Sequence, residues 1–341
     1  MLENKPLVSI IIVTLNRKDD LINCISSIQS QTYRNYELII IDNNSNDGTV
    51  DIIKKKFLKK KIFKTKKNLG TSYTRNAAVK FSKGDLIWFL DSDAYLFHEK
   101  VLETFVNKFK EKNDVSAFGG EGILDESQKI IGVKELKLFS NGMIKGFTHK
   151  NQQNIIYTKV LATCNLIIKK KIFLEIGGFD HFYFFYLEDI DLTYRIYKKK
   201  FKIEIINNCP VVHTFSKKSR FRNFFKTNRN RIYFLIKNYH FKHVVLLPFF
   251  DVLYVFNLDS FRRFFQKFYI NSKKDKFNTH ENKKKFKITN MINSIYLSTL
   301  VIGSMVFSYF FIPYYLINIK KIKKEQNFLE LINNDDFMKI S

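Results

Sequence analysis

Cysteine and proline are scarce in this chain of 341 residues, and each shortage excludes a class of protein. The three cysteines, Cys24, Cys164 and Cys209, are far apart and form no CxxC pair, which excludes a disulfide-rich scaffold and a zinc ribbon. The four prolines and twelve glycines form no Pro- or Gly-rich linker. Hydrophobic residues make up 45% of the chain, which excludes a wholly disordered protein. The length predicts roughly two domains, or one large domain with an appendage.

No N-terminal signal peptide is expected either. Residues 1–6 include charged side chains, and the apolar run at 7–15 has no small-residue cleavage site behind it. We therefore expect the folded part of the protein to face the cytoplasm.

Acidic residues are outnumbered by basic ones, 32 against 58, which gives a net charge of +26. Residues 191–341 hold 29 basic and 10 acidic residues and so carry +19 of that charge. Such an excess attracts polyanions: phosphate-rich ligands, nucleic acid or an anionic membrane surface. Lys, Asn, Ile and Phe are all abundant, as an AT-rich genome would produce, so the total charge alone does not choose among these partners.

Apolar runs of strand length alternate with stretches of helical periodicity through the first hundred residues. Strands are predicted at 8–14, 36–41, 61–64 and 86–90. Helices are predicted at 17–31 and 71–81, and a further helix, capped by Asp47, runs to 57. Strands buried on both faces and separated by helices predict a doubly wound, mainly parallel α/β sheet. Later strands are predicted at 160–169 and 202–207, and later helices at 171–176 and 189–200. After residue 216 the composition changes to aromatic and basic residues.

Polar residues follow three of these strands. Thr14 and Asn16 follow the first strand, Asp42 the second, and Asp91 and Asp93 the fourth. Ligands of doubly wound sheets bind outside the carboxyl ends of the strands, so we expect these side chains at one edge. Asp42 there either accepts a hydrogen bond from a nucleobase or caps its own loop.

The D-x-D at Asp91 and Asp93 is the sharpest local feature. Two nearby carboxylates repel each other unless a cation neutralises them, and hard oxygen ligands suit Mg²⁺ or Mn²⁺. The alternative is a capping aspartate in a solvated turn. Arg75, on a helix near the same edge, either holds a diphosphate or is a solvated helix residue.

A second acidic group, Glu188, Asp189 and Asp191, begins a helix. Acids at a helix N-terminus are stabilised by the helix dipole, so ordinary capping is one interpretation. A carboxylate partly desolvated by aromatic rings is instead a candidate general base, and this group follows Phe182, Phe184, Phe185 and Tyr186. His213, further along, is either a metal ligand or a core histidine.

Five segments taken in order resemble the family 2 glycosyltransferases: VSIIIVTLNR, YELIIIDNNSNDGT, NLGTSYTRNAA, GDLIWFLDSDA and GGFDHFYFFYLEDIDLTYR. The resemblance covers roughly residues 6–215. It implies a GT-A catalytic domain over 1–216, with a nucleotide-binding half (1–95) and an acceptor-binding half (96–216). It also implies inverting transfer of a hexose or deoxyhexose from a nucleotide diphosphate donor, with Mg²⁺ or Mn²⁺ as cofactor.

On the donor side, the resemblance implies that Thr14 and Asn16 line the nucleoside pocket. Asp42 would contact the base, and Arg75 would lie near the diphosphate. One residue departs from the pattern, because many family members carry Glu where this chain has Arg17.

On the catalytic side, Asp91 and Asp93 correspond to the family's D-x-D, with Asp93 the more direct metal ligand. His213 corresponds to a histidine that many relatives place on the metal. Asp189 corresponds to the catalytic base. The neighbouring acids would orient the acceptor or its loop: Glu188 and Asp191. The EDIDLTYR stretch is most like members that act on lipid-linked saccharides, including rhamnosyltransferases.

Two stretches after residue 216 have membrane features. The first, RFRNFFKTNRNRIYFLIK from 220, interleaves basic and aromatic residues, as an interfacial helix does; the alternative is a soluble helix packed on the catalytic domain. The second, 288–319, has 32 residues without a charge, whereas a bilayer span needs about 20. It is predicted to be one span, an interfacial or re-entrant pair broken at Gly303 and Pro313, or a packed core helix.

We therefore expect 217–341 to be a helical, membrane-associating extension. It would hold the enzyme at the cytoplasmic face of the cell membrane, peripherally or by one span, near a glycan or lipid-linked acceptor of cell-wall or polysaccharide biosynthesis. No nucleic-acid partner is expected, because no RRM or OB pattern accompanies the basic residues. A catalytically inactive nucleotide- or saccharide-binding module at the membrane surface is the alternative.

Overall fold

The structure is a computed structural model, and it describes residues 5–57, 61–124, 129–149, 156–207, 211–213, 224–239, 244, 303, 306–324 and 328–340. The chain forms two compact units. The first contains Met1–Leu138, Ile144–Ser216 and Lys323–Ser341, and the second contains Phe139–Met143 and Lys217–Ile322.

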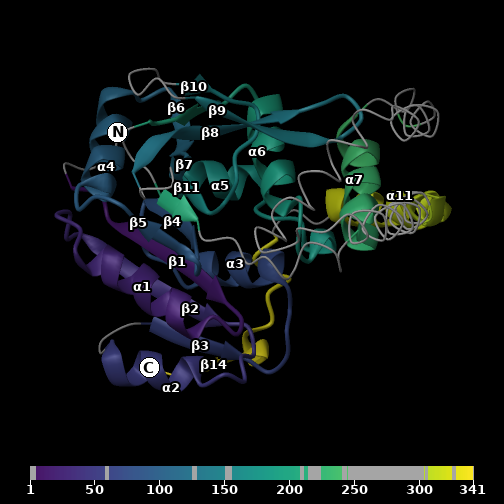
Figure 1. The fold of residues 1–341 in the computed structure, drawn as a ribbon. Helices are drawn as coiled ribbons and strands as arrows, with labels where there is room; N and C mark the ends of the chain where they lie inside the picture. The colour runs from purple at the N-terminus through teal and green to yellow at the C-terminus, as the bar shows by residue number, and fades with distance from the viewer. Residues whose placement is uncertain are drawn as a thin grey trace, which may run out of the picture. The chain divides into compact units, whose positions relative to one another are not determined.

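Four parallel strands form the base of the first unit (Figure 1). They are β1 (Val8–Thr14), β2 (Tyr36–Asp42), β3 (Lys61–Thr65) and β4 (Leu86–Asp91), which pair in the order β4-β1-β2-β3. The helices between them are α1 (Lys18–Gln29), α2 (Thr49–Lys56) and α3 (Thr71–Lys80). The strand and helix alternation predicted for the first hundred residues is confirmed.

The sheet as a whole is mixed, which corrects the expectation of a mainly parallel one. The strand β11 (Asn165–Lys169) is antiparallel to both β4 and β6 (Val115–Gly119), and β12 (Lys202–Ile205) is parallel to β6 and antiparallel to β10 (Ile156–Tyr157). A buried strand has the same apolar pattern whichever direction it runs, so the sequence does not report this difference.

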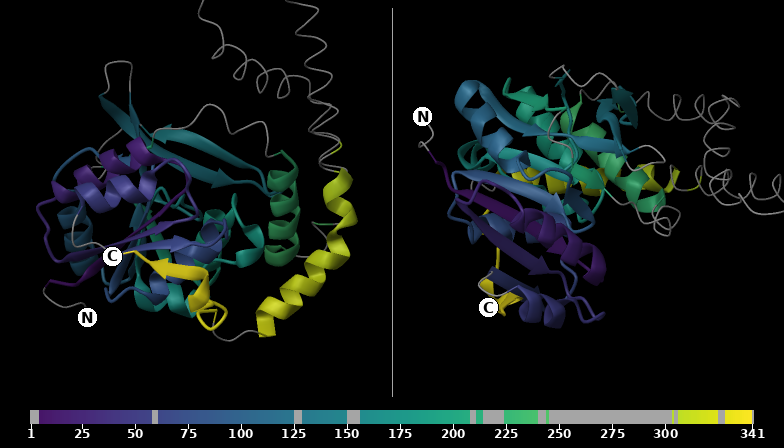
Figure 2. Two further views of the ribbon diagram at one scale, coloured as in Figure 1. Left: turned by 90° about the horizontal axis from the view of Figure 1, so that it is seen from below. Right: turned by 60° about the vertical axis from the view of Figure 1, so that its left-hand side comes forward.

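The C-terminal residues return to the first unit. The strand β14 (Phe337–Lys339) pairs antiparallel with β3 and is the yellow arrow beside the C mark in the left view of Figure 2. The Tyr73 hydroxyl donates to Asp336 Oδ2 at 2.7 Å and accepts the Asn333 N–H at 2.9 Å. The sequence pattern predicts that all residues after 216 belong to the C-terminal extension, and this is wrong for residues 323–341. A strand of three residues is too short to show a periodicity in the sequence.

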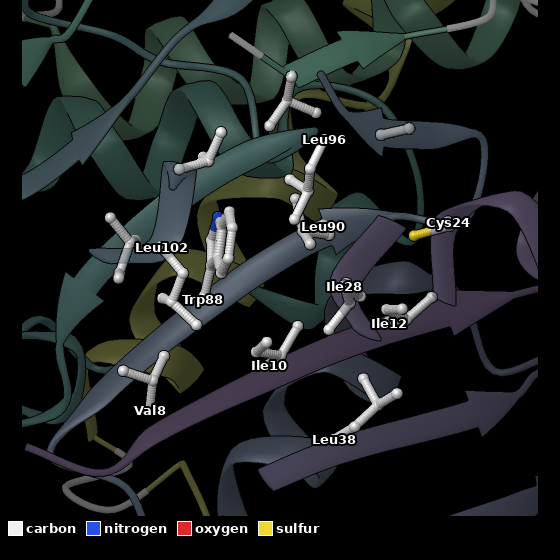
Figure 3. Close-up of a cluster of buried hydrophobic side chains, with 14 of the residues drawn as sticks. Val8, Ile10, Ile12, Cys24, Ile28, Leu38, Trp88, Leu90, Leu96 and Leu102 are labelled. Atoms are coloured by element: carbon white, nitrogen blue, oxygen red, sulfur yellow. The ribbon is translucent and has the colours of Figure 1, made fainter. Parts of the chain in front are cut away.

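Alternate residues of the central strands face two separate cores, which is why these strands are apolar throughout. Ile10 and Ile12 pack with α1, α2 and α4 (Val101–Glu111), whereas Ile11 packs with α3, α5 (Lys170–Ile176) and α6 (Glu188–Lys198). Figure 3 shows the first core, in which Trp88 lies near Leu102 and Leu90, and side chains of β1, β2 and α1 extend the same cluster. Helices on both faces leave the ends of the strands as the accessible part of the sheet.

A second sheet of five strands lies in the first unit, in the order β5-β13-β7-β8-β9. Its strands are β5 (Ala94–Leu96), β13 (Val211–His213), β7 (Glu121–Leu124), β8 (Ile130–Leu138) and β9 (Ile144–His149). The antiparallel pairing of β13 with β5 sets His213 opposite Ala94, the residue after Asp93. This pairing is what brings His213 to the D-x-D.

The second unit contains α7 (Phe224–Asn238) and, as far as Ile322, α11 (Ile312–Lys324). Six successive residues of α7 are buried, from Asn230 to Leu235, so this part of the helix packs against other parts of the chain. No helix within the described residues has the length and hydropathy needed to cross a bilayer. Residues 288–302, 304 and 305 of the uncharged stretch lie outside the described residues.

Candidate active site

The polar residues expected at one edge of the sheet do meet there. In the strand register Thr14 is opposite Asp42, and Val13 is opposite Asp91. Asp93 follows Asp91 through a turn rather than along an extended strand. The edge between β1 and β4 is also where the order of the parallel strands reverses, the usual place for a ligand in such sheets.

Asp91, Asp93 and His213 each offer one ligand atom, and the three atoms lie within 4.8 Å of one another. His213 Nε2 is 3.0 Å from Asp93 Oδ1 and 3.6 Å from Asp91 Oδ2. Two carboxylates with one imidazole form a donor set that accepts Mg²⁺ or Mn²⁺. The residues present therefore fit the cation that the sequence predicts.

A second group, Glu121, Cys164 and His213, is equally compact. Glu121 is engaged by Lys134 Nζ at 2.7 Å, however, and burial raises the pKa of the Cys164 thiol well above its usual value. A protonated thiol is a poor metal ligand. The oxygen-rich group is the better cation site.

Asp93 and His213 favour each other's charged form. Burial raises the pKa of Asp93, but the hydrogen bond with His213 and the charges of His213 and Arg17 outweigh it, so the net shift is downward. Burial lowers the pKa of His213, but the hydrogen bond to Asp93 and the charges of Asp91 and Asp93 outweigh it, so the net shift is upward. Asp93 is therefore ionised at neutral pH, as a metal ligand must be.

Arg75 joins the two acidic groups. Its Nη2 donates to Asp91 Oδ1 at 2.7 Å, its Nη1 donates to Glu188 Oε1 at 2.9 Å, and its guanidinium lies 5.5 Å from the centre of the Phe179 ring. Arg75 is only 5% exposed, so the interpretation as a solvated helix residue is wrong.

Asp189 lies within electrostatic reach of these same groups. Burial and the charge of Glu188 raise the pKa of Asp189 to about 7, the charge of Asp91 also raises it, and the charge of Arg75 lowers it. Its Oδ1 accepts the N–H of Ile190 at 2.8 Å, which fixes the carboxylate at the start of α6. A carboxylate with a pKa near neutrality is suited to accept a proton.

The loop that precedes Glu188 is strained. Phe184, Tyr186 and Leu187 all have positive φ, at 58°, 74° and 68°. The Phe184 carbonyl accepts hydrogen bonds from the backbone N–H and the Oγ1 of Thr71, at 2.7 and 3.0 Å. Strain of this kind persists only where its surroundings hold it, and it clusters at functional sites.

Three of the expected residues, Asn16, Asp42 and Asp191, make local side-chain hydrogen bonds, and a fourth, Thr14, does not within the described part of the chain. Thr14 Oγ1 is buried and has no hydrogen-bond partner among the described residues, and Asn16 Oδ1 accepts the Asn46 N–H at 2.9 Å. Asp42 is fully buried and its carboxylate accepts the Ser45 N–H, as the loop-capping alternative predicts. Asp191 is fully buried and is held by Tyr183 and Arg195.

Sequence reasoning missed two residues at this site, Gly70 and Thr71, which hold the loop before Glu188. The signal available was a glycine directly before a predicted helix that begins with threonine. It was not specific, because a glycine before a helix is common.

Comparison with known proteins identifies relatives of this domain. Residues 9–177 match the family described as Glycosyl transferase family 2. The poly(ribitol-phosphate) beta-N-acetylglucosaminyltransferase TarP of Staphylococcus aureus (strain N315) is 40% identical over 128 residues, which are 36% of this chain and 39% of that protein. The UDP-Glc:alpha-D-GlcNAc-diphosphoundecaprenol beta-1,3-glucosyltransferase WfaP of Escherichia coli is 45% identical over 97 residues, 28% of this chain and 38% of that protein. The chain therefore spans less than half the length of these two relatives.

Two solved glycosyltransferases share the fold. GalNAc-T7, in a crystal structure with UDP, GalNAc and Mn²⁺, has a TM-score of 0.56 at 17% identity, over 69% of this chain and 48% of that one. The mannosyltransferase PcManGT of Pyrobaculum calidifontis, in complex with GDP-Man and Mn²⁺, has a TM-score of 0.55 at 13% identity, over 94% of this chain and 87% of that one. The α/β fold is thus that of GT-A-like glycosyltransferases.

Substituting Gly70 tests the loop that holds Glu188 and Asp189. Gly70 has φ of 80°, and a Cβ there would lie 2.6 Å from Phe184 Cδ2 and 2.7 Å from the Phe184 carbonyl oxygen. We expect Gly70→Ala to displace this loop and to lower kcat/KM for sugar transfer by about 100-fold, because a small misplacement of a reacting group is costly.

Gly48→Ala is the matched control. Gly48 also precedes a helix and has φ of 79°, but a Cβ added there would have nothing within 4 Å. It should lose about 1–2 kcal/mol of stability, the cost of a Cβ in the left-handed region, and little activity. Equal activity losses in the two variants would contradict a specific role for the Gly70–Phe184 contact.

Proposed function

Residues 9–177 of this chain form a family 2 glycosyltransferase domain, and we propose that the protein transfers a sugar from a nucleotide diphosphate donor to an acceptor hydroxyl with inversion. The observation that carries this proposal is the meeting of two acidic groups in one site. A candidate cation site at Asp91, Asp93 and His213 and a candidate base at Asp189 are linked through Arg75.

The chemistry divides between the two groups. A cation held by Asp91, Asp93 and His213 would neutralise the negative charge that develops on the leaving nucleoside diphosphate. Asp189 accepts the proton of the acceptor hydroxyl as that oxygen attacks the anomeric carbon. A single displacement with one base inverts the configuration and needs no second carboxylate as nucleophile.

The other site residues position these groups. We assign Thr14 and Asn16 to the donor edge, at the carboxyl end of β1. Asp42 shapes this edge through the loop that it caps. Arg75 and Glu188 hold the cation side and the base side together, and Asp191 fixes the start of α6 through Arg195.

The acceptor class is proposed from the relatives. TarP is named for poly(ribitol-phosphate), and WfaP for a diphosphoundecaprenol-linked GlcNAc. Both names describe a phosphate-bearing glycan or glycolipid. We therefore propose a glycan or lipid-linked saccharide acceptor, in the synthesis of a cell-wall polymer or polysaccharide, and Mn²⁺ or Mg²⁺ as cofactor.

A face of the second unit supports association with a membrane surface. Phe307, Phe310, Tyr314 and Ile317 are each more than half exposed and follow one another at helical spacing. Exposed Lys320 and the lysines after it follow this apolar stripe. Apolar side chains beside lysines are the pattern of a helix in the headgroup region of an anionic membrane.

Replacing the base tests the reaction. Asp189→Asn cannot accept a proton, so we expect nucleoside diphosphate release with Mn²⁺ and the best of a panel of UDP-, GDP- and dTDP-sugars to fall by about 100-fold or more. Binding of the nucleotide should be unchanged. Asp85→Asn, which removes an exposed carboxylate, is the control and should retain full turnover. Nucleotide binding without turnover in the unmodified protein would favour the inactive binding module instead.

The pH dependence of transfer tests the environment of Asp189. The base acts when ionised, so the rate should fall as the pH decreases through about 7. A bound cation would offset the charge of Asp91, which raises the pKa of Asp189, so with the cation present this fall in rate should occur at a somewhat lower pH. Glu188→Gln removes a charge that raises the pKa and should move the limb to lower pH in a kcat/KM profile. A profile identical to that of the unmodified enzyme would contradict Asp189 as the titrating group.

Vesicle binding tests the exposed apolar stripe. Phe310→Glu and Ile317→Glu should each weaken sedimentation with anionic phospholipid vesicles by about tenfold, because each removes one large side chain from the lipid. Tyr157→Glu replaces an equally exposed aromatic residue of the first unit and serves as control. Equal binding by all three variants and the unmodified protein would show that the stripe is not the membrane contact.

A further inference from the structure

Arg17 lies beside the candidate cation site, on the strand-to-helix connection before α1. Its Nη1 is 2.8 Å from Asp93 Oδ2, and the other oxygen of that carboxylate, Oδ1, is 3.0 Å from His213 Nε2. Both oxygens of Asp93 thus face a positively charged or hydrogen-bonding partner. A cation that uses Asp93 competes directly with the guanidinium.

Arg17 differs from the other arginine of the site in how firmly it is held. The Arg75 side chain is 7% exposed and is clamped between Asp91 and Glu188. The Arg17 side chain is 29% exposed, and its second partner is Asp20, whose Oδ2 lies 3.1 Å from the same Nη1 and whose side chain is 40% exposed. Arg17 therefore has an alternative carboxylate that is exposed and lies outside the cation site, whereas the carboxylate that Arg75 pairs with outside that site, Glu188, is buried with it.

We propose that Arg17 is an exchangeable counter-ion of the cation site, an inference that rests on the proposed metal-dependent function. In the free protein its guanidinium neutralises Asp93. When a divalent cation binds Asp93, like-charge repulsion moves the guanidinium away, and Asp20 retains it at the mouth of the site. A guanidinium released there has hydrogen-bond donors free for an anionic donor group, for which its planar fork is well suited.

Two consequences follow for binding. The cation alone binds less tightly than its three ligands would permit, because it must displace Arg17. A bound nucleoside diphosphate gives the displaced guanidinium a new partner, so cation and nucleotide strengthen each other's binding, and such coupling is reciprocal. Arg17 is thus a positioning residue that links occupation of the cation site to occupation of the donor site.

The test measures Mn²⁺ affinity without turnover, from the electron paramagnetic resonance signal of free Mn²⁺. Arg17→Gln should bind Mn²⁺ alone about tenfold more tightly than the unmodified protein, since a competing ion pair of this exposure has a modest strength. Arg17→Lys keeps the charge and should stay within about threefold of the unmodified protein. Lys18→Gln removes the neighbouring positive charge, which has no ion pair with Asp93, and controls for net charge.

The same titrations with UDP or GDP, corrected for Mn²⁺ bound by the nucleotide itself, measure the coupling. The unmodified protein should bind Mn²⁺ more tightly with nucleotide than without, and Arg17→Gln should lose most of this gain. Equal Mn²⁺ affinities for Arg17→Gln and Lys18→Gln would overturn the proposal. Failure of both the unmodified protein and Arg17→Gln to retain Mn²⁺ even with nucleotide would instead contradict the metal-dependent function itself.

Discussion

The arrangement of the site depends on one buried positive charge, the guanidinium of Arg75. A buried charge is tolerated only when it is paired and hydrogen-bonded, and removing one partner of a buried pair costs about 3–5 kcal/mol. Arg75 meets this requirement with Asp91 at the end of β4 and Glu188 at the start of α6, at 2.7 and 2.9 Å. These two residues are almost a hundred positions apart in the sequence. Charge compensation therefore holds the candidate cation site and the candidate base in one place.

The strained loop before Glu188 completes this arrangement. Thr71, at the start of the helix that carries Arg75, donates its backbone N–H to the Phe184 carbonyl and its hydroxyl to Glu188 Oε1. Gly70 leaves the space that the Phe184 ring and carbonyl occupy. Positive φ at successive large residues is unfavourable in isolation, and these contacts from α3 supply the restraint that maintains it. The same helix thus fixes both the charge of Arg75 and the backbone of the loop before Glu188.

Much of this could be predicted from local sequence pattern. The runs of β-branched residues in β1 and β2 and the D-x-D after β4 placed the polar edge, because buried parallel strands and their carboxyl ends follow from periodicity alone. The pairing of β13 with β5, which delivers His213, involves residues more than a hundred positions apart and has no local signal. The antiparallel direction of β11 and the return of β14 were inaccessible for the same reason. Arg75 was recognised as a site residue, but its burial could not be read from a helix of mixed polarity.

The pKa values of the two key carboxylates of the site are shifted in opposite directions. At Asp93, the neighbouring His213 and Arg17 lower the pKa, so this carboxylate stays ionised and a proton does not compete with a cation for it. At Asp189, burial and Glu188 raise the pKa to about 7, which gives this carboxylate a useful affinity for a proton at neutral pH. Carboxylates whose surroundings separate their pKa values in this way are the ones to which different chemical roles belong. The surroundings that separate Asp93 from Asp189 thus favour the first as the cation ligand and the second as the base.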